Sequence, residues 1–174
     1  MEKSNVKKLA FAGILIAVGV VCSPLSIPVG ASRCFPVQHF VNVLAAVLLG
    51  PWYGAGMAAV TSLLRVMLGT GSLLAFPGSM CGALLCGLIF RYTGNEWLTY
   101  AGEIFGTAVI GGLLAYPVAT LLMSKEAALF AYILPFFVST AGGTILAAVL
   151  LTVLKKTKVL SRISFAENPG RSAK

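Results

Sequence analysis

The sequence predicts an all-α integral membrane protein with six transmembrane helices. Of the 174 residues, 58% are hydrophobic and only 10% are charged, and the mean hydropathy is +0.93. So few polar groups do not suffice to cover the surface of a water-soluble globule. The apolar residues also form six runs separated by short breaks, and about 20 apolar residues are needed for a helix to cross the hydrocarbon core.

The six predicted spans use nearly the whole chain. They are 8–22, 37–50, 51–69, 73–92, 98–123 and 132–154. The first has the basic start of a signal peptide, but Val20 and Val21 precede Cys22 where cleavage needs small residues, so we expect a retained helix. We therefore expect one transmembrane domain over 1–155 and a basic tail over 156–174.

The second and third spans are expected to form a tight helical hairpin. Pro36 precedes the second span, and Gly50 and Pro51 interrupt the chain before the third. Trp52 and Tyr53, at the predicted tip, are aromatic residues of the kind that lie at the headgroup level. The tip should therefore mark one membrane face.

Basic residues predict which face is cytoplasmic. With six spans, the chain ends and the turn after the fourth span fall on one side, which the positive-inside rule makes cytoplasmic. The net charge of +8 is then an orientation signal and an attraction to anionic lipid. A nucleic-acid partner is not expected, because the tail is short and lacks interleaved aromatic residues. The basic residues on this side are Lys3, Lys7, Lys8, Arg91, Lys155, Lys156, Lys158, Arg162, Arg171 and Lys174.

Polar side chains gather in the half of the protein away from the hairpin tip. At a rise of about 1.5 Å per residue, Asn42 lies roughly 12 Å from the tip, Gln38 roughly 18 Å and Arg65 roughly 20 Å. They therefore predict a pocket that opens to the outside. The candidate ligand contacts are Arg33, Gln38, His39, Asn42, Arg65, Ser72, Phe76, Ser79, Tyr116 and Ser139.

Each polar residue also has a structural interpretation. Gln38 and Asn42 are side chains that often hydrogen-bond between membrane helices, and Arg65 is long enough to snorkel to the headgroups. His39 is expected to have no carboxylate, cysteine or second histidine nearby, so a structural role is expected over metal ligation. We predict neither a metal nor a cofactor.

The predicted pocket contains no acid. The chain has no aspartate. Glu103 is expected near the cytoplasmic end of the fifth span, where a pairing with Arg91 is favoured and proton coupling is the alternative. Such a pocket suits a neutral heteroaromatic molecule or an anion and disfavours a cation.

The first span carries small residues at helical spacing, Ala10, Gly13 and Ala17. Small residues let another helix approach closely in lipid, so this stripe favours a partner helix, with packing inside the bundle as the alternative. The chain has no ATP-binding loop, because the glycine-rich turn over 69–72 lacks a following lysine. It also lacks a nucleophile with a base, so we do not predict an enzyme.

Four segments together resemble a known family. Six short spans, the small-residue stripe on the first span, a polar loop before the second and the hairpin LLGPWYG resemble the substrate-binding S components of energy-coupling factor (ECF) vitamin transporters. The four segments are SIPVG from Ser26, CFPVQHFVNVLAAVLLGPWYG from Cys34, LLRVMLGTGSLLAFPGSM from Leu63 and GEIFGTAVIGGLLAYP from Gly102. More narrowly, they resemble the ThiW family, which is associated with uptake of the thiazole precursor of thiamine. The resemblance covers about 8–155.

This resemblance implies a division of labour. An S component in the plasma membrane of a prokaryote captures hydroxyethylthiazole from outside, with the first outer loop as a lid. It then docks through the small-residue stripe on a transmembrane coupling subunit driven by two ATPase subunits. The stripe offers Gly13 and Ala17 where the family pattern is AxxxA, which permits an equally close approach. A stand-alone or ion-coupled carrier and, less readily, a membrane enzyme remain open.

Overall fold

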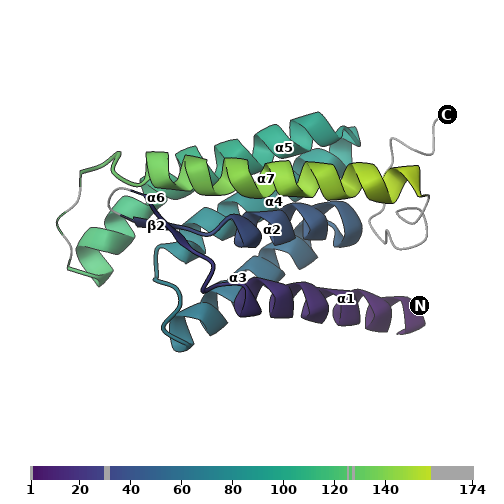
Figure 1. Ribbon diagram of the computed structural model, residues 1–174, viewed down its shortest axis with the longest axis horizontal. Coiled ribbons are helices and arrows are strands. Elements are labelled where there is room, and N and C mark those ends of the chain that lie inside the picture. Colours follow the sequence, from purple (N-terminus) through teal and green to yellow (C-terminus); the bar gives the residue numbers. More distant parts are fainter. Residues whose placement is uncertain (1, 30–31, 125, 127, 158–174) are drawn as a thin grey trace.

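The computed structural model describes residues 2–29, 32–124, 126 and 128–157. Within these residues the chain forms six helical runs along one long axis, as the sequence predicts (Figure 1). The protein is therefore an all-α membrane protein. The first four helices are α1 (Glu2–Val21), α2 (Pro36–Leu49), α3 (Pro51–Met67) and α4 (Ala75–Thr93). The fifth run joins α5 (Glu96–Phe105), η1 (Gly106–Gly111), α6 (Gly112–Pro117) and η2 (Val118–Leu122), and α7 (Ile133–Lys156) is the last.

The turns at one end of the bundle are short and are formed by glycine, proline and asparagine residues that suit helix ends. Gly50 separates α2 from α3 with a φ of 93°, and Pro51 then begins α3. Gly94 ends α4 in the left-handed conformation, and the Asn95 side chain caps α5 by accepting a hydrogen bond from the Trp97 amide at 2.9 Å. The start of α1 and the end of α7 lie at this same end (Figure 1).

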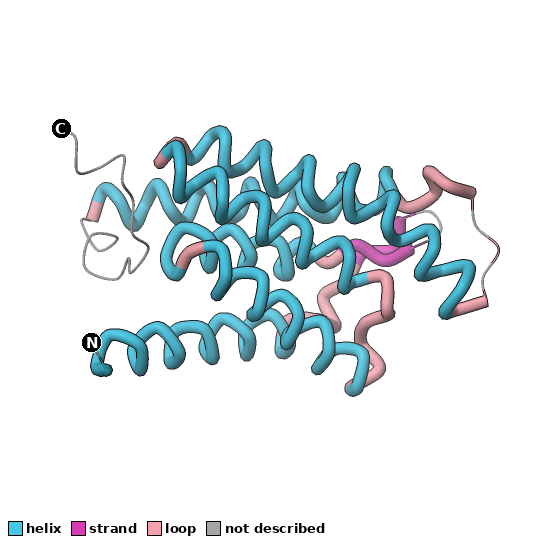
Figure 2. The backbone as a smooth tube through the Cα atoms, turned by 180° about the vertical axis from the view of Figure 1, so that it is seen from behind, coloured by secondary structure: helices cyan, strands magenta, loops and turns pink. Residues whose placement is uncertain are grey.

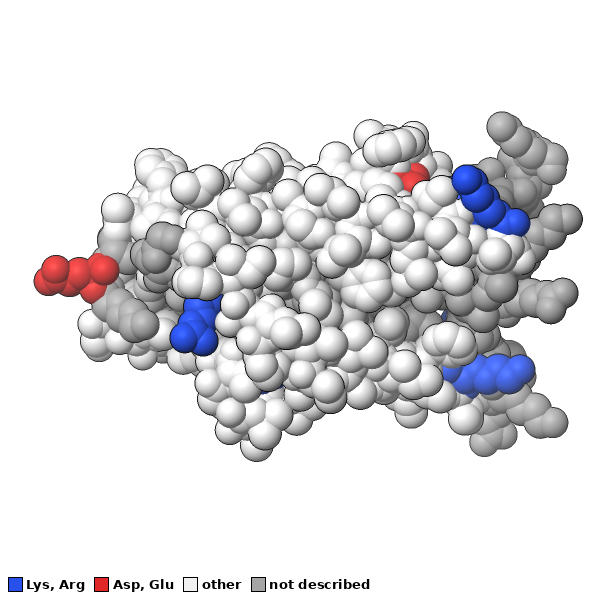
Figure 3. Space-filling view, in the orientation of Figure 1, with Lys and Arg blue, Asp and Glu red and all other residues white. Residues whose placement is uncertain are grey.

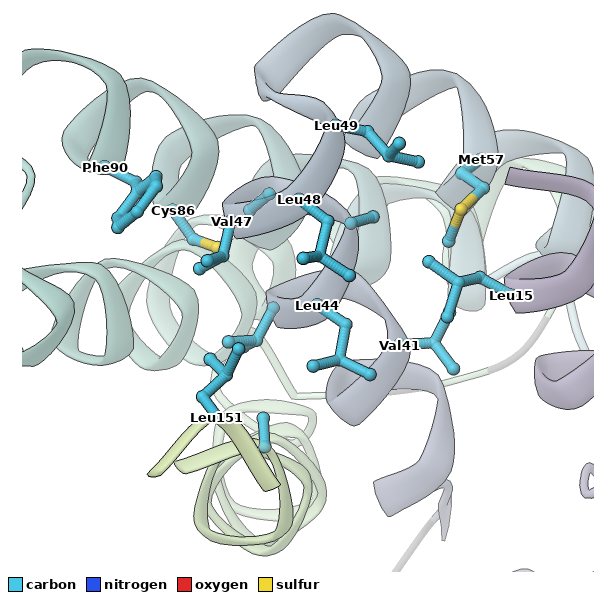
Figure 4. Close-up of a cluster of buried hydrophobic side chains, with 14 of the residues drawn as sticks. Leu15, Val41, Leu44, Val47, Leu48, Leu49, Met57, Cys86, Phe90 and Leu151 are labelled. Carbon is cyan, nitrogen blue, oxygen red and sulfur yellow. The ribbon is translucent and has the colours of Figure 1, made fainter. Parts of the chain in front are cut away.

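Helix α2 lies at the centre of the bundle. Every residue from Val41 to Leu49 is buried, and its side chains pack against α1, α3, α4 and α7 (Figure 4). From Val43 to Leu49 the helix is apolar on all sides, as is expected in such a position. Gly143 lets α7 approach α2, because a Cβ there would lie 2.7 Å from the Phe40 amide nitrogen.

The outer surface suits lipid. Three of the described helical runs are long and apolar enough to cross a membrane: Ala75–Thr93, Glu96–Leu122 and Ile133–Lys156. Large hydrophobic side chains such as Leu134, Ile145 and Val149 are exposed on α7. Charged side chains on the face in Figure 3 lie towards its two ends, and the stretch between them is white.

Two features were not predicted. The loop between α1 and α2 contains an antiparallel hairpin of β1 (Ile27–Val29) and β2 (Ser32–Cys34), in which Ile27 pairs with Cys34. This hairpin lies at the end of the bundle opposite the described ends of the chain (Figure 2). The fifth run is also not a uniform α-helix, because η1 and η2 are π-helical. The predicted tail lies outside the described residues from 158 onward.

Candidate functional site

A small pocket lies among the starts of α2, α4 and α7 and the end of α3, away from the α2–α3 turn. Its volume is about 40 Å³, which is room for only a few water molecules. Polar residues, the rings of two phenylalanines and three small or aliphatic residues form its walls. They are Arg33, Phe35, Gln38, His39, Arg65, Ser72, Leu74, Ala75, Gly78, Ser79, Thr107, Phe136 and Ser139.

Arg65 forms one wall and is almost fully buried, with 1% of its surface exposed. Its Nη1 donates a hydrogen bond to Gln38 Oε1 at 3.1 Å, and its Cζ lies 3.8 Å from the centre of the Phe35 ring. Phe35 is itself held in place, because its amide donates to Ser139 Oγ at 2.7 Å. The expectation that Arg65 and Gln38 lie at the same depth is confirmed, and the alternative that Arg65 snorkels to the surface is wrong.

The described residues that line the pocket include no acid, as predicted, but Glu103 is not at the cytoplasmic face. It is fully buried and does not pair with Arg91; instead its Oε1 lies 2.9 Å from His39 Nδ1. Asn42 Nδ2 donates to the same oxygen at 3.2 Å, and the Thr107 hydroxyl does so at 3.4 Å. With the carboxylate ionised, the His39 Nδ1–H is a third donor. The expectation that His39 has no carboxylate nearby is therefore also wrong.

The position of Glu103 follows from helix rise and from a glycine. Glu103 is seven residues above Glu96, and Asn42 is eight residues above Gly50, so both lie about 10–12 Å from the same end of the bundle. Gly82 on α4 leaves space for the carboxylate, since a Cβ there would lie 2.9 Å from both of its oxygens. The first turn of α5 is thus close to that end, but Glu103 is two turns further in.

A chain of hydrogen bonds joins the buried cation to the buried anion. Gln38 accepts from Arg65 and donates through Nε2 to Asn42 Oδ1 at 3.4 Å, and Asn42 donates to Glu103. Asn42 Nδ2 also donates to the Ser79 carbonyl at 3.2 Å. The amides therefore bond between helices, and Gln38 faces the pocket as well. The structural and ligand-binding interpretations of Gln38 do not exclude each other.

The structure brings together seven of the ten candidate ligand contacts. Asn42 lies beneath the pocket, and Phe76 and Tyr116 are half-buried outside its lining. Sequence reasoning did not include Phe35, Glu103, Thr107 or Phe136. The depth of Glu103 could have been predicted by counting the helix rise from the start of α5. Phe136 is placed by contact with Gly78, where a Cβ would lie 2.8 Å from its ring. The seven are Arg33, Gln38, His39, Arg65, Ser72, Ser79 and Ser139.

The small-residue stripe on α1 faces outward. Ala10, Gly13 and Ala17 are all exposed, and a Cβ at Gly13 would meet nothing within 4 Å. The inner side of α1 instead carries Ala12 and Leu15, which are buried. The alternative that the stripe packs inside the bundle is therefore wrong.

The donor set of the site does not resemble a metal centre. His39 and Glu103 meet as a pair, and the described residues contain no group of three or more His, Cys, Asp or Glu side chains placed to hold a metal ion. The arrangement is suited to binding a small polar molecule with an aromatic part, since two rings and several hydrogen-bonding groups share one buried wall.

Comparison with known proteins identifies the family. Residues 9–157 match the model of the ThiW family, described as thiamine-precursor transporter protein. No curated protein and no solved structure matches the chain. The match covers the helical bundle from Leu9 onward, including every residue of the pocket. The chain therefore belongs to the ThiW family of thiamine-precursor transporters.

Proposed function

We propose that this transporter is the substrate-binding S component of an ECF transporter and that it captures hydroxyethylthiazole from outside the cell. The observation that carries the proposal is the buried pocket in which Arg65, Gln38 and the Phe35 ring meet. It lies away from the α2–α3 turn and from the described ends of the chain. In this proposal those ends are cytoplasmic, and the membrane is the plasma membrane of a prokaryote.

The charge of the pocket supports a ligand that is not a cation. Glu103 does not line the pocket, and its carboxylate already contacts His39, Asn42 and Thr107. Arg65 and the rim residue Arg33 supply positive charge with no surplus of acid. The described pocket lining thus carries two arginines and no acid, which favours a thiazole over cationic thiamine.

The pocket must widen when the ligand binds. A volume of about 40 Å³ does not hold a substituted thiazole ring. The β1–β2 hairpin carries Arg33 and leads directly into Phe35, so its displacement would open the pocket. We expect this hairpin to be the lid implied by the resemblance to S components.

The exposed stripe on α1 supports a partner. Ala10, Gly13 and Ala17 offer a surface on which a second helix can approach closely. The chain has no ATP-binding loop, so a coupling subunit with two ATPases would supply the energy. Gly13→Leu should abolish docking and leave ligand binding intact, because the stripe is remote from the pocket.

The experiment is uptake of labelled hydroxyethylthiazole by cells with and without the coupling subunit and ATPases. We expect uptake only with the complete module, and its loss in Gly13→Leu. The matched control is Ala101→Leu, which enlarges an exposed alanine on α5. Uptake that persists without the module would contradict the proposal.

That outcome would favour a second candidate, an ion-coupled carrier that works alone. The observation behind it is the buried pair of His39 and Glu103, since ionisable groups inside membranes often serve proton transfer. A dependence of module-free uptake on the proton gradient would distinguish this carrier from a passive one.

A further inference from the structure

The guanidinium of Arg65 is only partly satisfied. Its Nη1 is bonded to Gln38, and one face is covered by the Phe35 ring. Its Nε and Nη2 are buried and have no hydrogen-bond partner in the described part of the chain. Buried donors are nearly always paired, and leaving them unpaired is costly. This edge is therefore a place where a partner from outside the chain is expected.

The two free donors lie on the same edge of the guanidinium. Nε and Nη2 point in nearly the same direction, which matches the two oxygens of a carboxylate or phosphate. The Gln38 contact and the Phe35 ring fix the plane of the group, so the edge has a defined direction. Arg65 is one of the residues that line the pocket.

Arg65 also has no carboxylate in direct contact among the described residues. The close contacts between acidic and basic side chains are His39 with Glu103 and Lys155 with Glu96, and neither includes Arg65. Glu103 is linked to Arg65 only through Gln38 and Asn42. A buried cation without a counter-ion is strongly disfavoured. An anionic group at the free edge would supply both the charge and the two acceptors, whereas a hydroxyl group supplies one acceptor and no charge.

We propose that the free edge of Arg65 receives an oxyanion of the ligand, so that the protein prefers a thiazole bearing a phosphate or carboxylate group to the neutral thiazole alcohol. This inference rests on the proposed function and names the substrate class more narrowly. Arg33 at the rim adds a second positive charge to the same pocket. The shared chemistry is a pair of adjacent anionic oxygens attached to the heterocycle.

The test is calorimetric titration of the purified full-length protein with three ligands: hydroxyethylthiazole, its phosphate ester and a methylthiazole carboxylate. We expect at least one anion to bind ten times or more tighter than the alcohol, a difference of about 1.4 kcal/mol. Arg65→Lys keeps the positive charge but removes the two parallel N–H donors of the guanidinium. It should therefore reduce this preference to less than threefold. Arg91→Lys, on the exposed end of α4, should leave the preference unchanged.

The preference is the ratio of the affinities for the anion and the alcohol, both measured on the same protein. Partial unfolding of a variant lowers the active fraction for both ligands alike, so it does not create a preference. If Arg65→Lys fails to fold, the wild-type comparison still decides. Equal or weaker binding of both anions by the wild type would overturn the inference and leave the proposed function standing, as would a preference that survives Arg65→Lys. If none of the three thiazoles binds, the proposed function fails and the inference fails with it.

Discussion

Replacing Glu103 should destabilise the protein more than any other change to its few acidic residues. Glu103→Ala removes the acceptor used by His39, Asn42 and Thr107, at distances of 2.9, 3.2 and 3.4 Å. Asn42 keeps its hydrogen bond to the Ser79 carbonyl, but His39 Nδ1 loses its hydrogen bond to the Glu103 carboxylate. A buried group left without its hydrogen-bond partner typically costs about 1–3 kcal/mol, and Glu103→Ala leaves both His39 Nδ1 and the Thr107 hydroxyl in that position. Glu103→Gln retains an acceptor of the same shape, so its cost should be smaller, about 1–3 kcal/mol.

The matched control is Glu96→Gln on the same helix. Glu96 pairs with Lys155 at 2.6 Å, but the lysine side chain is 45% exposed, and exposed ion pairs contribute about 0–1 kcal/mol. Thermal unfolding in detergent, followed by intrinsic fluorescence, measures the difference. For a chain of this size about 1 kcal/mol shifts the midpoint by roughly 2–4 °C, so Glu103→Ala should lower it by about 10 °C. A midpoint within 2 °C of the wild type, or an equal loss in Glu96→Gln, would refute the reasoning.

Three further predictions concern the packing of the site. Gly82→Ala should lower the unfolding midpoint and weaken thiazole binding, because its Cβ would overlap the Thr107 hydroxyl. The control Gly13→Ala should change neither quantity, because its Cβ would meet no atom within 4 Å. Equal effects of the two substitutions would contradict this packing. Phe35→Leu removes the ring from Arg65 and should weaken thiazole binding about three- to tenfold by calorimetry; an unchanged affinity would show that the ring does not matter. Burial raises the pKa of the Cys34 thiol, and the thiolate is the form that reacts. A variant with Cys34 as its sole cysteine should therefore react with a maleimide at pH 7 at least tenfold more slowly when folded than when unfolded. Equal rates in the two states would contradict the burial.

The helices and their order could be predicted from the sequence because the solvent is lipid. Apolar runs of sufficient length form helices there, and breakers such as Gly50 with Pro51 mark their ends. The depth of Gln38 and Arg65 was predictable for the same reason, since rise along a helix is constant. These two predictions depend only on local regularity, and the contact between the two side chains confirms them.

The side chains in and around the pocket were harder to predict from the sequence. Glu103 was assigned to a membrane face because it lies early in its helix, but two turns of helix carry it to the depth of Asn42. Its inward direction depends on Gly82, which belongs to another helix. Phe35 is placed over Arg65 by a bond to Ser139 that joins residues 104 positions apart. Such contacts arise from the packing of helices and leave no periodic pattern in the sequence.

The most direct test of the account is whether hydroxyethylthiazole binds in this pocket. Calorimetric titration of the purified wild type should show saturable binding of one ligand per chain. Ala75→Trp, which places a large ring in the pocket lining, should abolish it, while Ala101→Trp on the exposed face of α5 should not. Absence of saturable binding by the wild type, or full binding by Ala75→Trp, would contradict the account.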